Sequence, residues 1–265
     1  MFFNLKNATA LVTGASKGLG AAFARDLASR GTNLVLVARS IKSLQDLANS
    51  LSQKHGVRCL ALEADLADPG AVGRIVEVLD GLGISVDLLI NNAGLGLTGR
   101  FLRHDLDKEF GTIQVNVNSL VGLTHAFGQR MAQRGRGGII NLASNAAFLP
   151  LPYLATYAAA KAFVLHFTEA IRFEMRSSGV QVMAVVPGPT ATNFFEGVST
   201  SMSAADLDDA HDVVRATIGA FLNGQSVAYP GRVSVRLGTL IPRVFSRDAV
   251  VRAAASKTEK MGLAS

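Results

Sequence analysis

The chain has 265 residues, 49% of them hydrophobic and 17% charged, which excludes a disordered tail and predicts a single domain with a large buried core. Its net charge of +6 is concentrated near the end, because residues 1–228 carry +1 and residues 229–265 carry +5. Since no zinc-finger, RNP-like or recognition-helix pattern accompanies this charge, we expect no nucleic-acid partner.

A single cysteine, Cys59, rules out an intrachain disulfide and fits a reducing compartment. The first expected strand begins by Ala8, which leaves no room for a signal peptide before it. No apolar run approaches the roughly 20 residues of a membrane-spanning helix. We therefore expect a cytoplasmic protein.

The first strand, expected at 8–12, leads into a glycine-rich turn and then an amphipathic helix that runs to Arg30. The glycines are spaced G-x-x-x-G-x-G, which differs from the commoner G-x-G-x-x-G. A phosphate at such a junction would meet backbone N–H groups and the positive end of the helix. The residues expected at that contact are Gly14, Ser16, Lys17, Gly18, Leu19 and Gly20.

The second strand, 33–38, ends at Arg39, about twenty residues beyond the glycine turn. A carboxylate at this position would bind the ribose 2′-hydroxyl of NAD, whereas an arginine suits the 2′-phosphate of NADP. Arg39 is present without a neighbouring Asp or Glu, and Lys17 supplies a second cation. The pair favours NADP(H) as the cofactor, because a guanidinium holds a phosphate through two parallel hydrogen bonds.

Further apolar strands alternate with amphipathic helices along the rest of the chain. The strands are expected at 57–63, 86–90, 137–143, 180–186 and 226–229. This alternation predicts a parallel sheet with helices on both faces, which binds ligands at the carboxyl ends of its strands. The glycine turn, Arg39, Asp65, Asn91 and Ser144 all fall at those ends.

A helix that begins near Pro152 carries Tyr157 and Lys161 on one face, roughly 40° apart around its axis. An ammonium beside a phenol stabilises the phenolate, so we expect the pKa of Tyr157 to fall toward the working pH. Ser144, at the end of strand 137–143, can present a hydroxyl to the same point. Taken alone, a Tyr-x-x-x-Lys pair also occurs by chance on many helices.

These motifs together resemble the classical short-chain dehydrogenases/reductases over about residues 6–230. They are Thr13-Gly14-x-x-x-Gly18-x-Gly20, Asn91-Asn92-Ala93-Gly94, Asn116, Ser144, Tyr157-x-x-x-Lys161 and Pro187-Gly188-x-x-x-Thr192. In detail the chain is similar to a bacterial branch of NADP-dependent oxidoreductases whose substrates are mostly unassigned. The resemblance implies a single-domain Rossmann-type doubly wound fold, with about seven parallel strands and helices on both faces.

The resemblance also implies roles for individual residues. Tyr157 would be the general acid or base, Lys161 would lower its pKa, Ser144 would bind the substrate oxygen, and Asn116 would hold a proton-relaying water. Asp65 and Leu66 would lie near the adenine, Asn91 near its ribose and Thr192 near the carboxamide. The expected cofactor contacts are completed by Ala93, Gly94, Pro187 and Gly188. No metal site is expected.

The expected substrate pocket is apolar. Its walls are Leu95, Leu97, Ala146, Phe148, Leu149, Tyr153, Phe194 and Phe195, together with the hydroxyl of Ser144. No Lys or Arg is expected to face a substrate carboxylate or phosphate there. We predict a hydrophobic ketone or secondary alcohol as substrate, covered by a mobile flap over residues 190–209.

Residues 1–235 are expected to form the family domain, and residues 236–265 a basic extension packed on it. Three interpretations of this extension compete: it covers the substrate mouth or a subunit interface, it is a loosely held solvated tail, or it touches an anionic membrane surface.

The favoured function is an NADPH-dependent carbonyl reductase or alcohol dehydrogenase. Two alternatives stay open: a catalytically silent NADP(H)-binding regulator or scaffold, and an enzyme that uses the same tyrosine in dehydration or epimerisation. The family usually pairs its fifth and sixth helices, so we expect a homodimer or homotetramer through the helices within 105–134 and 153–178.

Overall fold

The computed structural model describes residues 3–192, 201 and 203–264. Its centre is a seven-stranded parallel sheet with the strand order β3-β2-β1-β4-β5-β6-β7. The strands are β1 (Thr9–Thr13), β2 (Asn33–Ala38), β3 (Cys59–Glu63), β4 (Leu88–Asn91), β5 (Gly137–Leu142), β6 (Val180–Val185) and β7 (Val227–Ala228). The order reverses between β1 and β4, which is the point where open sheets of this kind bind ligands. The predicted fold class is therefore confirmed.

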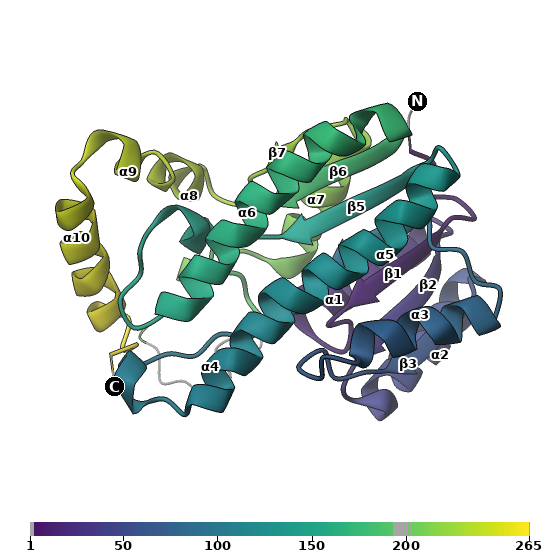
Figure 1. Cartoon of the computed structure of the whole chain (residues 1–265), viewed down its shortest axis with the longest axis horizontal. Helices are drawn as coiled ribbons and strands as arrows, with labels where there is room; N and C mark the ends of the chain where they lie inside the picture. The colour runs from purple at the N-terminus through teal and green to yellow at the C-terminus, as the bar shows by residue number, and fades with distance from the viewer. Residues whose placement is uncertain (1–2, 193–200, 202, 265) are drawn as a thin grey trace.

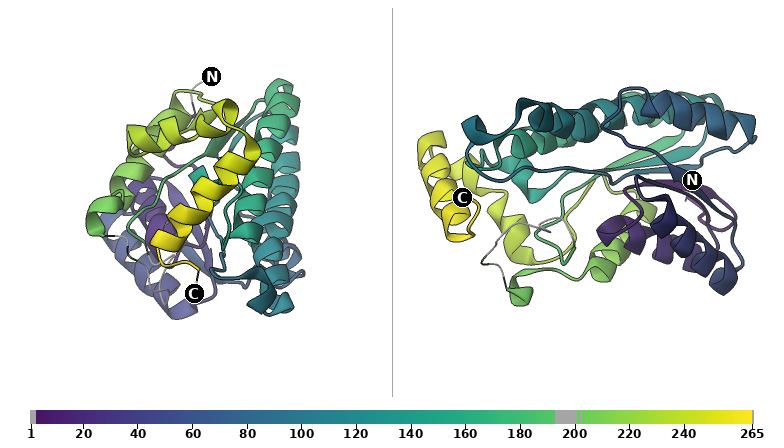
Figure 2. Two further views of the ribbon diagram at one scale, coloured as in Figure 1. Left: turned by 90° about the vertical axis from the view of Figure 1, so that its left-hand side faces the viewer. Right: turned by 90° about the horizontal axis from the view of Figure 1, so that it is seen from below.

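Helices cover both faces of the sheet (Figure 1; the right-hand view of Figure 2 shows the sheet between two helical layers). They are α1 (Gly18–Ser29), α2 (Ile41–His55), α3 (Ala71–Gly81), α4 (Leu106–Ile113), α5 (Ser119–Gln133), α6 (Ala155–Met175) and α7 (Ala210–Leu222). Successive side chains of a strand point to opposite faces of the sheet, so Ala10 and Val12 belong to one core cluster and Leu11 to the other. Because these strand residues are all apolar, both faces of the sheet pack against helices.

The stretch 105–134, expected as one long helix, is a continuous helical run with an irregular middle. Residues Gln114–Asn118 form a π-helical segment between α4 and α5, and Asn116 lies inside it. In such segments the backbone hydrogen bonds span five residues instead of four, which widens the helix, and they are frequent at functional sites. Here the segment brings the Asn116 amide to the loop that follows β4.

Three short helices gather at one end of the molecule: α8 (Val233–Gly238), α9 (Ile241–Val244) and α10 (Arg247–Lys260). The left-hand view of Figure 2 looks onto this end, with α10 crossing it. Val235 of α8 packs against the α-carbon of Gly188, just after β6. The C-terminal extension is thus joined to the loops that follow the sheet.

The flap expected at 190–209 falls partly outside the described residues. Its described part contains a short 3₁₀ helix, Ala204–Asp206, and a parallel bridge between Thr190 and Asp208. Within the described ranges, none of the helices is both long enough and apolar enough to cross a membrane.

Candidate active site

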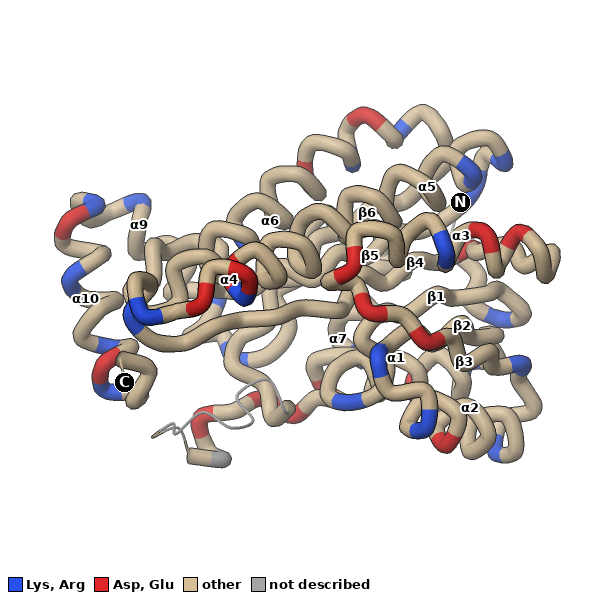
Figure 3. The backbone as a smooth tube through the Cα atoms, turned by 60° about the horizontal axis from the view of Figure 1, so that its bottom comes forward, with Lys and Arg blue, Asp and Glu red and all other residues tan. Residues whose placement is uncertain are grey.

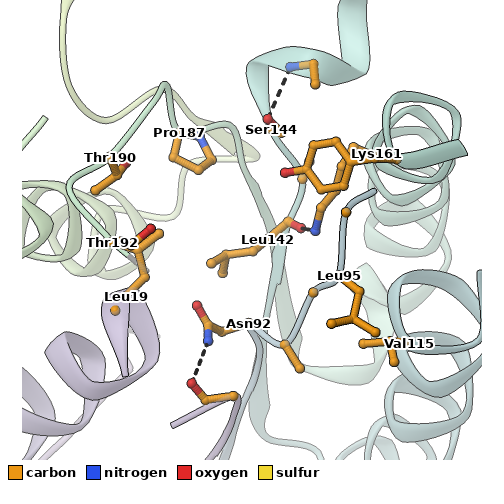
Figure 4. Close-up of a pocket in the computed structure, with 18 of the residues that line it drawn as sticks. Leu19, Asn92, Leu95, Val115, Leu142, Ser144, Lys161, Pro187, Thr190 and Thr192 are labelled. Carbon is orange, nitrogen blue, oxygen red and sulfur yellow. Dashed lines mark hydrogen bonds between the residues drawn. The ribbon is translucent and has the colours of Figure 1, made fainter. Parts of the chain in front are cut away.

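A cavity of about 970 Å³ opens at the carboxyl edge of the sheet. Segments that follow β1, β2, β3, β4, β5 and β6 contribute to its wall, as do α6 and α10. In the close-up of Figure 4, Leu19 and Thr192 lie on the side of the cavity opposite Leu95 and Lys161. The strand ends thus meet where the sequence predicts the site.

The glycine turn depends on close backbone approach. A Cβ at Gly20 would lie 2.2 Å from the carbonyl oxygen of Gly14, and Gly14 itself has φ +65° and faces Asn92 Nδ2. Helix α1 begins at Gly18 behind Lys17, whose side chain makes no capping hydrogen bond. Gly18 and Leu19, the first residues of α1, line the cavity, so the N-terminus of the helix lies in its wall, where a phosphate can bind.

Asn92 braces this turn against the loop that follows β4. Its Nδ2 donates to the carbonyl oxygen of Thr13 at 2.8 Å, and Thr13 Oγ1 accepts from the backbone N–H groups of Asn92 and Ala93, both at 3.0 Å. Asn92 lines the cavity, although the sequence argument assigned it no role. The doubled asparagine in Asn91-Asn92 was the available signal.

Asn91, expected near the cofactor's ribose, turns its side chain away from the cavity. Its side chain is buried and donates to Thr124 Oγ1 at 3.0 Å and to Asn141 Oδ1 at 2.9 Å, so it points between the strands and helix α5. Gly20 also lies outside the cavity wall, since it packs on Gly14. The remaining residues expected at the cofactor all line the cavity: Gly14, Ser16, Lys17, Gly18, Leu19, Arg39, Asp65, Leu66, Ala93, Gly94, Tyr157, Lys161, Pro187, Gly188 and Thr192.

The chemistry-bearing side chains come together from β5 and α6. Ser144 follows β5, and its hydroxyl hydrogen-bonds the Tyr157 hydroxyl. Lys161 Nζ lies 5.7 Å from the centroid of the Tyr157 ring and donates to the carbonyl oxygen of Leu142 at 2.8 Å (Figure 4). The predicted meeting of Ser144, Tyr157 and Lys161 is present in the structure.

The pKa of Tyr157 is raised in the structure, whereas the sequence predicted that it would fall. Burial raises the pKa of Tyr157 to about 12, although the Ser144 hydrogen bond acts in the opposite direction. Burial also lowers the pKa of Lys161 to about 8. The cost of placing a phenolate in this low-dielectric site outweighs the Ser144 hydrogen bond. Tyr157 therefore holds its proton at neutral pH.

Asn116 aims a carbonyl oxygen at the same place. Its Nδ2 donates to the carbonyl oxygens of Leu95 (2.6 Å) and Thr112 (2.8 Å), while its buried Oδ1 has no partner among the described residues. A Cβ at Gly94 would lie 3.0 Å from Asn116 Oδ1 and 3.5 Å from Lys161 Nζ. The acceptor and the ammonium thus face one gap, which only a glycine at position 94 leaves open.

Of the expected substrate walls, Leu95, Ser144, Ala146 and Leu149 line the cavity. Leu97, Phe148 and Tyr153 do not: Phe148 packs near the Tyr229 ring at 6.2 Å between centroids, and Tyr153 bonds to Glu259. Phe194 and Phe195 lie outside the described residues. The wall also includes residues that the sequence argument missed: Asn145, Leu151, Leu154, Ala254, Lys257, Thr258 and Met261.

Lys257 brings a further cation to the wall of the cavity, beyond those expected at the cofactor. It belongs to α10 together with Ala254 and Thr258, which are buried. The sequence predicts a basic extension here but not which of its residues turn inward.

The sequence profile described as short chain dehydrogenase matches residues 8–203. The chain belongs to the short chain dehydrogenase family. The match covers the glycine turn, Asn116, Ser144, Tyr157 and Lys161 in a single stretch.

This family member is similar to both curated and solved relatives. A very-long-chain 3-oxoacyl-CoA reductase of Anas platyrhynchos is 35% identical over 80% of this chain and 68% of the relative. A short-chain dehydrogenase from Sphingobium yanoikuyae, solved in complex with NADPH, is 33% identical over 89% of this chain and 93% of that one, with a TM-score of 0.81. The bulky-bulky ketone specific alcohol dehydrogenase from Comamonas testosteroni is 31% identical over 95% and 98%, with a TM-score of 0.78.

Proposed function

We propose that this short-chain dehydrogenase is an NADP(H)-dependent oxidoreductase that interconverts hydrophobic ketones and secondary alcohols. The observation that carries the proposal is that one cavity is lined both by the glycine turn and by Ser144, Tyr157 and Lys161. A phosphate-binding turn and an acid–base pair in one cavity suit a reaction between a dinucleotide and a carbonyl compound.

The residues present fit NADP(H). Gly14 and Gly18 line the cavity with positive φ, a backbone conformation that other residues rarely adopt, and the turn would hold a pyrophosphate through its backbone N–H groups. Lys17 and Arg39 supply two cations to the cavity wall for a 2′-phosphate. Asp65 and Leu66 would hold the adenine, while Lys161 and Thr192 would hold the nicotinamide end. The NADPH complex of the Sphingobium relative supports this choice.

When bound, the nicotinamide supplies or accepts the hydride. Tyr157 would donate its phenolic proton to the carbonyl oxygen, and Ser144 Oγ would hydrogen-bond the same oxygen as negative charge develops on it. The Lys161 ammonium would stabilise the phenolate that remains, and Asn116 Oδ1 would accept from a water that returns a proton through Lys161.

We infer the substrate class from the part of the cavity wall near Ser144, Tyr157 and Lys161. Its apolar members are Leu95, Ala146, Leu149, Leu151, Leu154 and Met261. Ketones with bulky or long apolar substituents would bury the most surface there. The relatives that act on bulky ketones and on very-long-chain 3-oxoacyl-CoA support the same class.

The test is NADPH and NADH oxidation with ketones of graded size and polarity, for the wild type and Tyr157→Phe in parallel. We expect NADPH to be preferred, apolar ketones to turn over, and the variant to lose turnover while it still binds NADPH by fluorescence. Tight NADPH binding with no turnover on a broad panel, in either direction, would instead support the silent regulator.

We also propose a homodimer or homotetramer that uses the surface around α4 and α6. Large apolar side chains are exposed there, among them Phe110 (57%), Phe163 (41%) and Phe173 (73%). Burying them against a second copy would remove this surface from water. Light scattering coupled to size-exclusion chromatography measures the mass directly, and a monomer at micromolar concentration would contradict the proposal.

A further inference from the structure

Large apolar side chains are exposed along α8, α9 and the turns beside them. This C-terminal apolar patch consists of Val233 (71%), Leu237 (59%), Leu240 (45%), Ile241 (43%), Val244 (76%) and Phe245 (60%). The same helices are attached on their other side, where Val235 packs on Gly188 and Thr239 is buried. The patch is therefore the outer face of an anchored element rather than a frayed end.

Basic side chains surround the patch. Arg243 lies within it, and Arg247 and Arg252 follow on the exposed surface of α10 (Figure 3 shows the blue segments on α9 and α10). No ion pair to these three arginines is formed by the part of the chain that the structure describes. Residues 229–265 hold two acids: Asp248, which follows Arg247 on α10, and Glu259, which accepts a hydrogen bond from Tyr153 near the end of α10. The surface thus combines exposed apolar area with a net positive charge.

We propose that this end of the protein docks onto the surface of an anionic lipid bilayer. The apolar side chains of α8 and α9 would enter the headgroup boundary, and Arg243, Arg247 and Arg252 would face lipid phosphates. Short amphipathic elements with a basic rim bind membranes in this way, through buried apolar area and electrostatic attraction together. Peripheral contact of this kind is compatible with the cytoplasmic location expected from the sequence.

The charge argues against a second copy of the chain as the occupant. An isologous contact brings the same surface of two protomers together, so a surface on which Arg243, Arg247 and Arg252 outnumber the single nearby carboxylate of Asp248 would meet a surface of the same net charge. Lipid headgroups offer the complementary charge instead.

The position of the patch gives lipid contact a consequence. Helix α10, which follows the patch directly, lines the cavity through Ala254, Lys257, Thr258 and Met261. A bilayer against α8 and α9 would therefore lie at the end of the molecule where the cavity wall is formed by α10. This inference does not depend on the proposed reaction, because the patch lies outside the catalytic group.

Flotation of the full chain with vesicles tests the proposal. Vesicles of phosphatidylcholine alone are compared with vesicles that contain about a quarter phosphatidylglycerol. We expect the wild type to float with the anionic vesicles and to dissociate as salt screens the attraction. Because each basic residue near the surface contributes on the order of 1 kcal/mol, or about fivefold, Arg243→Gln/Arg247→Gln/Arg252→Gln should lower the partition coefficient by about a hundredfold.

The apolar half of the patch has its own variant and a matched control. Leu237→Ser/Val244→Ser should lower vesicle binding by about tenfold or more, since two apolar side chains no longer enter the boundary. Leu82→Ser/Leu102→Ser removes exposed leucines elsewhere (57% and 93%) and should bind like the wild type. Thermal unfolding and NADPH binding report whether each variant is folded.

Three results would overturn the proposal. The first is that the folded wild type fails to float with anionic vesicles, and the second is that it floats equally well with neutral ones. The third is that the patch variants bind vesicles as well as the Leu82→Ser/Leu102→Ser control does. Loss of an oligomer in Leu237→Ser/Val244→Ser, without vesicle binding by the wild type, would assign the patch to a second copy instead.

Discussion

The hydroxyl of Tyr153 donates a hydrogen bond of 2.7 Å to Glu259 Oε1, across 106 positions of the chain. Tyr153 lies just before α6, with φ +66° and its carbonyl oxygen bonded to the N–H of Gly99. Glu259 lies near the end of α10. The bond therefore joins the C-terminal helix to the loop that leads into the helix of Tyr157 and Lys161.

Tyr153→Phe should raise KM for ketones several-fold and change kcat little. Without the bond, α10 is held less firmly, and with it the part of the wall formed by Ala254, Thr258 and Met261. The effect should be modest because the bond is exposed to solvent. Glu259→Gln keeps a hydrogen-bond acceptor, so its KM should lie between those of the wild type and Tyr153→Phe. Steady-state kinetics with an apolar ketone, beside NADPH titration, measure this; a change in NADPH affinity alone would contradict it.

Lys257→Met should lower kcat/KM for acidic substrates but not for neutral ones. Lys257 is the cation of the α10 wall, so we expect kcat/KM for ketones with a distal carboxylate to fall about two- to fivefold, the size of a solvent-exposed charge interaction. Neutral ketones of the same length should be unaffected or slightly better. Lys260→Met is the control, because Lys260 belongs to the same helix but not to the wall. Equal effects on both substrates would place Lys257 outside the binding region.

The rate of reduction should fall at alkaline pH as Lys161 loses its proton. Burial lowers its pKa to about 8, so the ammonium is charged at neutral pH and loses its charge as pH rises through that value. The neutral amine no longer stabilises the Tyr157 phenolate, and log kcat/KM should decline by about one per pH unit above it. Lys161→Arg stays charged, so whatever activity it retains should lack this decline. A profile that is flat to about pH 10 would contradict the assignment.

The sheet was predictable because its signal is local. Each strand is an apolar run closed by turn residues, and the expected bounds of β2 agree with those observed, Asn33–Ala38. The location of the site followed as well, since parallel strands bring their carboxyl ends to one edge. Ser144, Tyr157 and Lys161 therefore line one cavity, although they come from separate elements.

The remaining differences depend on tertiary packing. Asn91 and Asn92 are adjacent in sequence, yet Asn91, the last residue of β4, turns toward Thr124, while Asn92, just beyond the strand, lines the cavity. The pKa of Tyr157 depends on how completely the site excludes water, which the spacing to Lys161 does not encode. The inward face of α10, with Val250, Ala254 and Thr258 buried, depends on packing against segments far away in the chain.

Arg39→Ala should weaken the binding of NADPH but not that of NADH. A hydrogen bond to a charged group contributes about 1.5–3 kcal/mol, so Kd for NADPH should rise roughly tenfold to a hundredfold while Kd for NADH stays near its wild-type value. Lys42→Ala is the matched control, because it removes an exposed cation of α2 that does not line the cavity. Equal losses for both cofactors would mean that Arg39 stabilises the fold rather than a 2′-phosphate.

Gly20→Ala should disrupt the glycine turn itself. Its Cβ would lie 2.2 Å from the Gly14 carbonyl oxygen, a backbone atom that cannot rotate away. Helix α1 would have to shift from the turn, at a cost of about 1–3 kcal/mol in the free energy of unfolding, and NADPH binding should fall with it.

Gly73→Ala is the control for Gly20→Ala, since it is also a helical glycine but has no atom within 4 Å of the added Cβ. This variant should be more stable by roughly 0.5–1 kcal/mol, because alanine loses less conformational entropy in a helix. Urea unfolding of the two variants and the wild type measures both changes. If Gly20→Ala matches or exceeds the stability of the wild type, α1 does not pack on the turn as closely as the structure places it, and the phosphate-binding role of that turn fails with it.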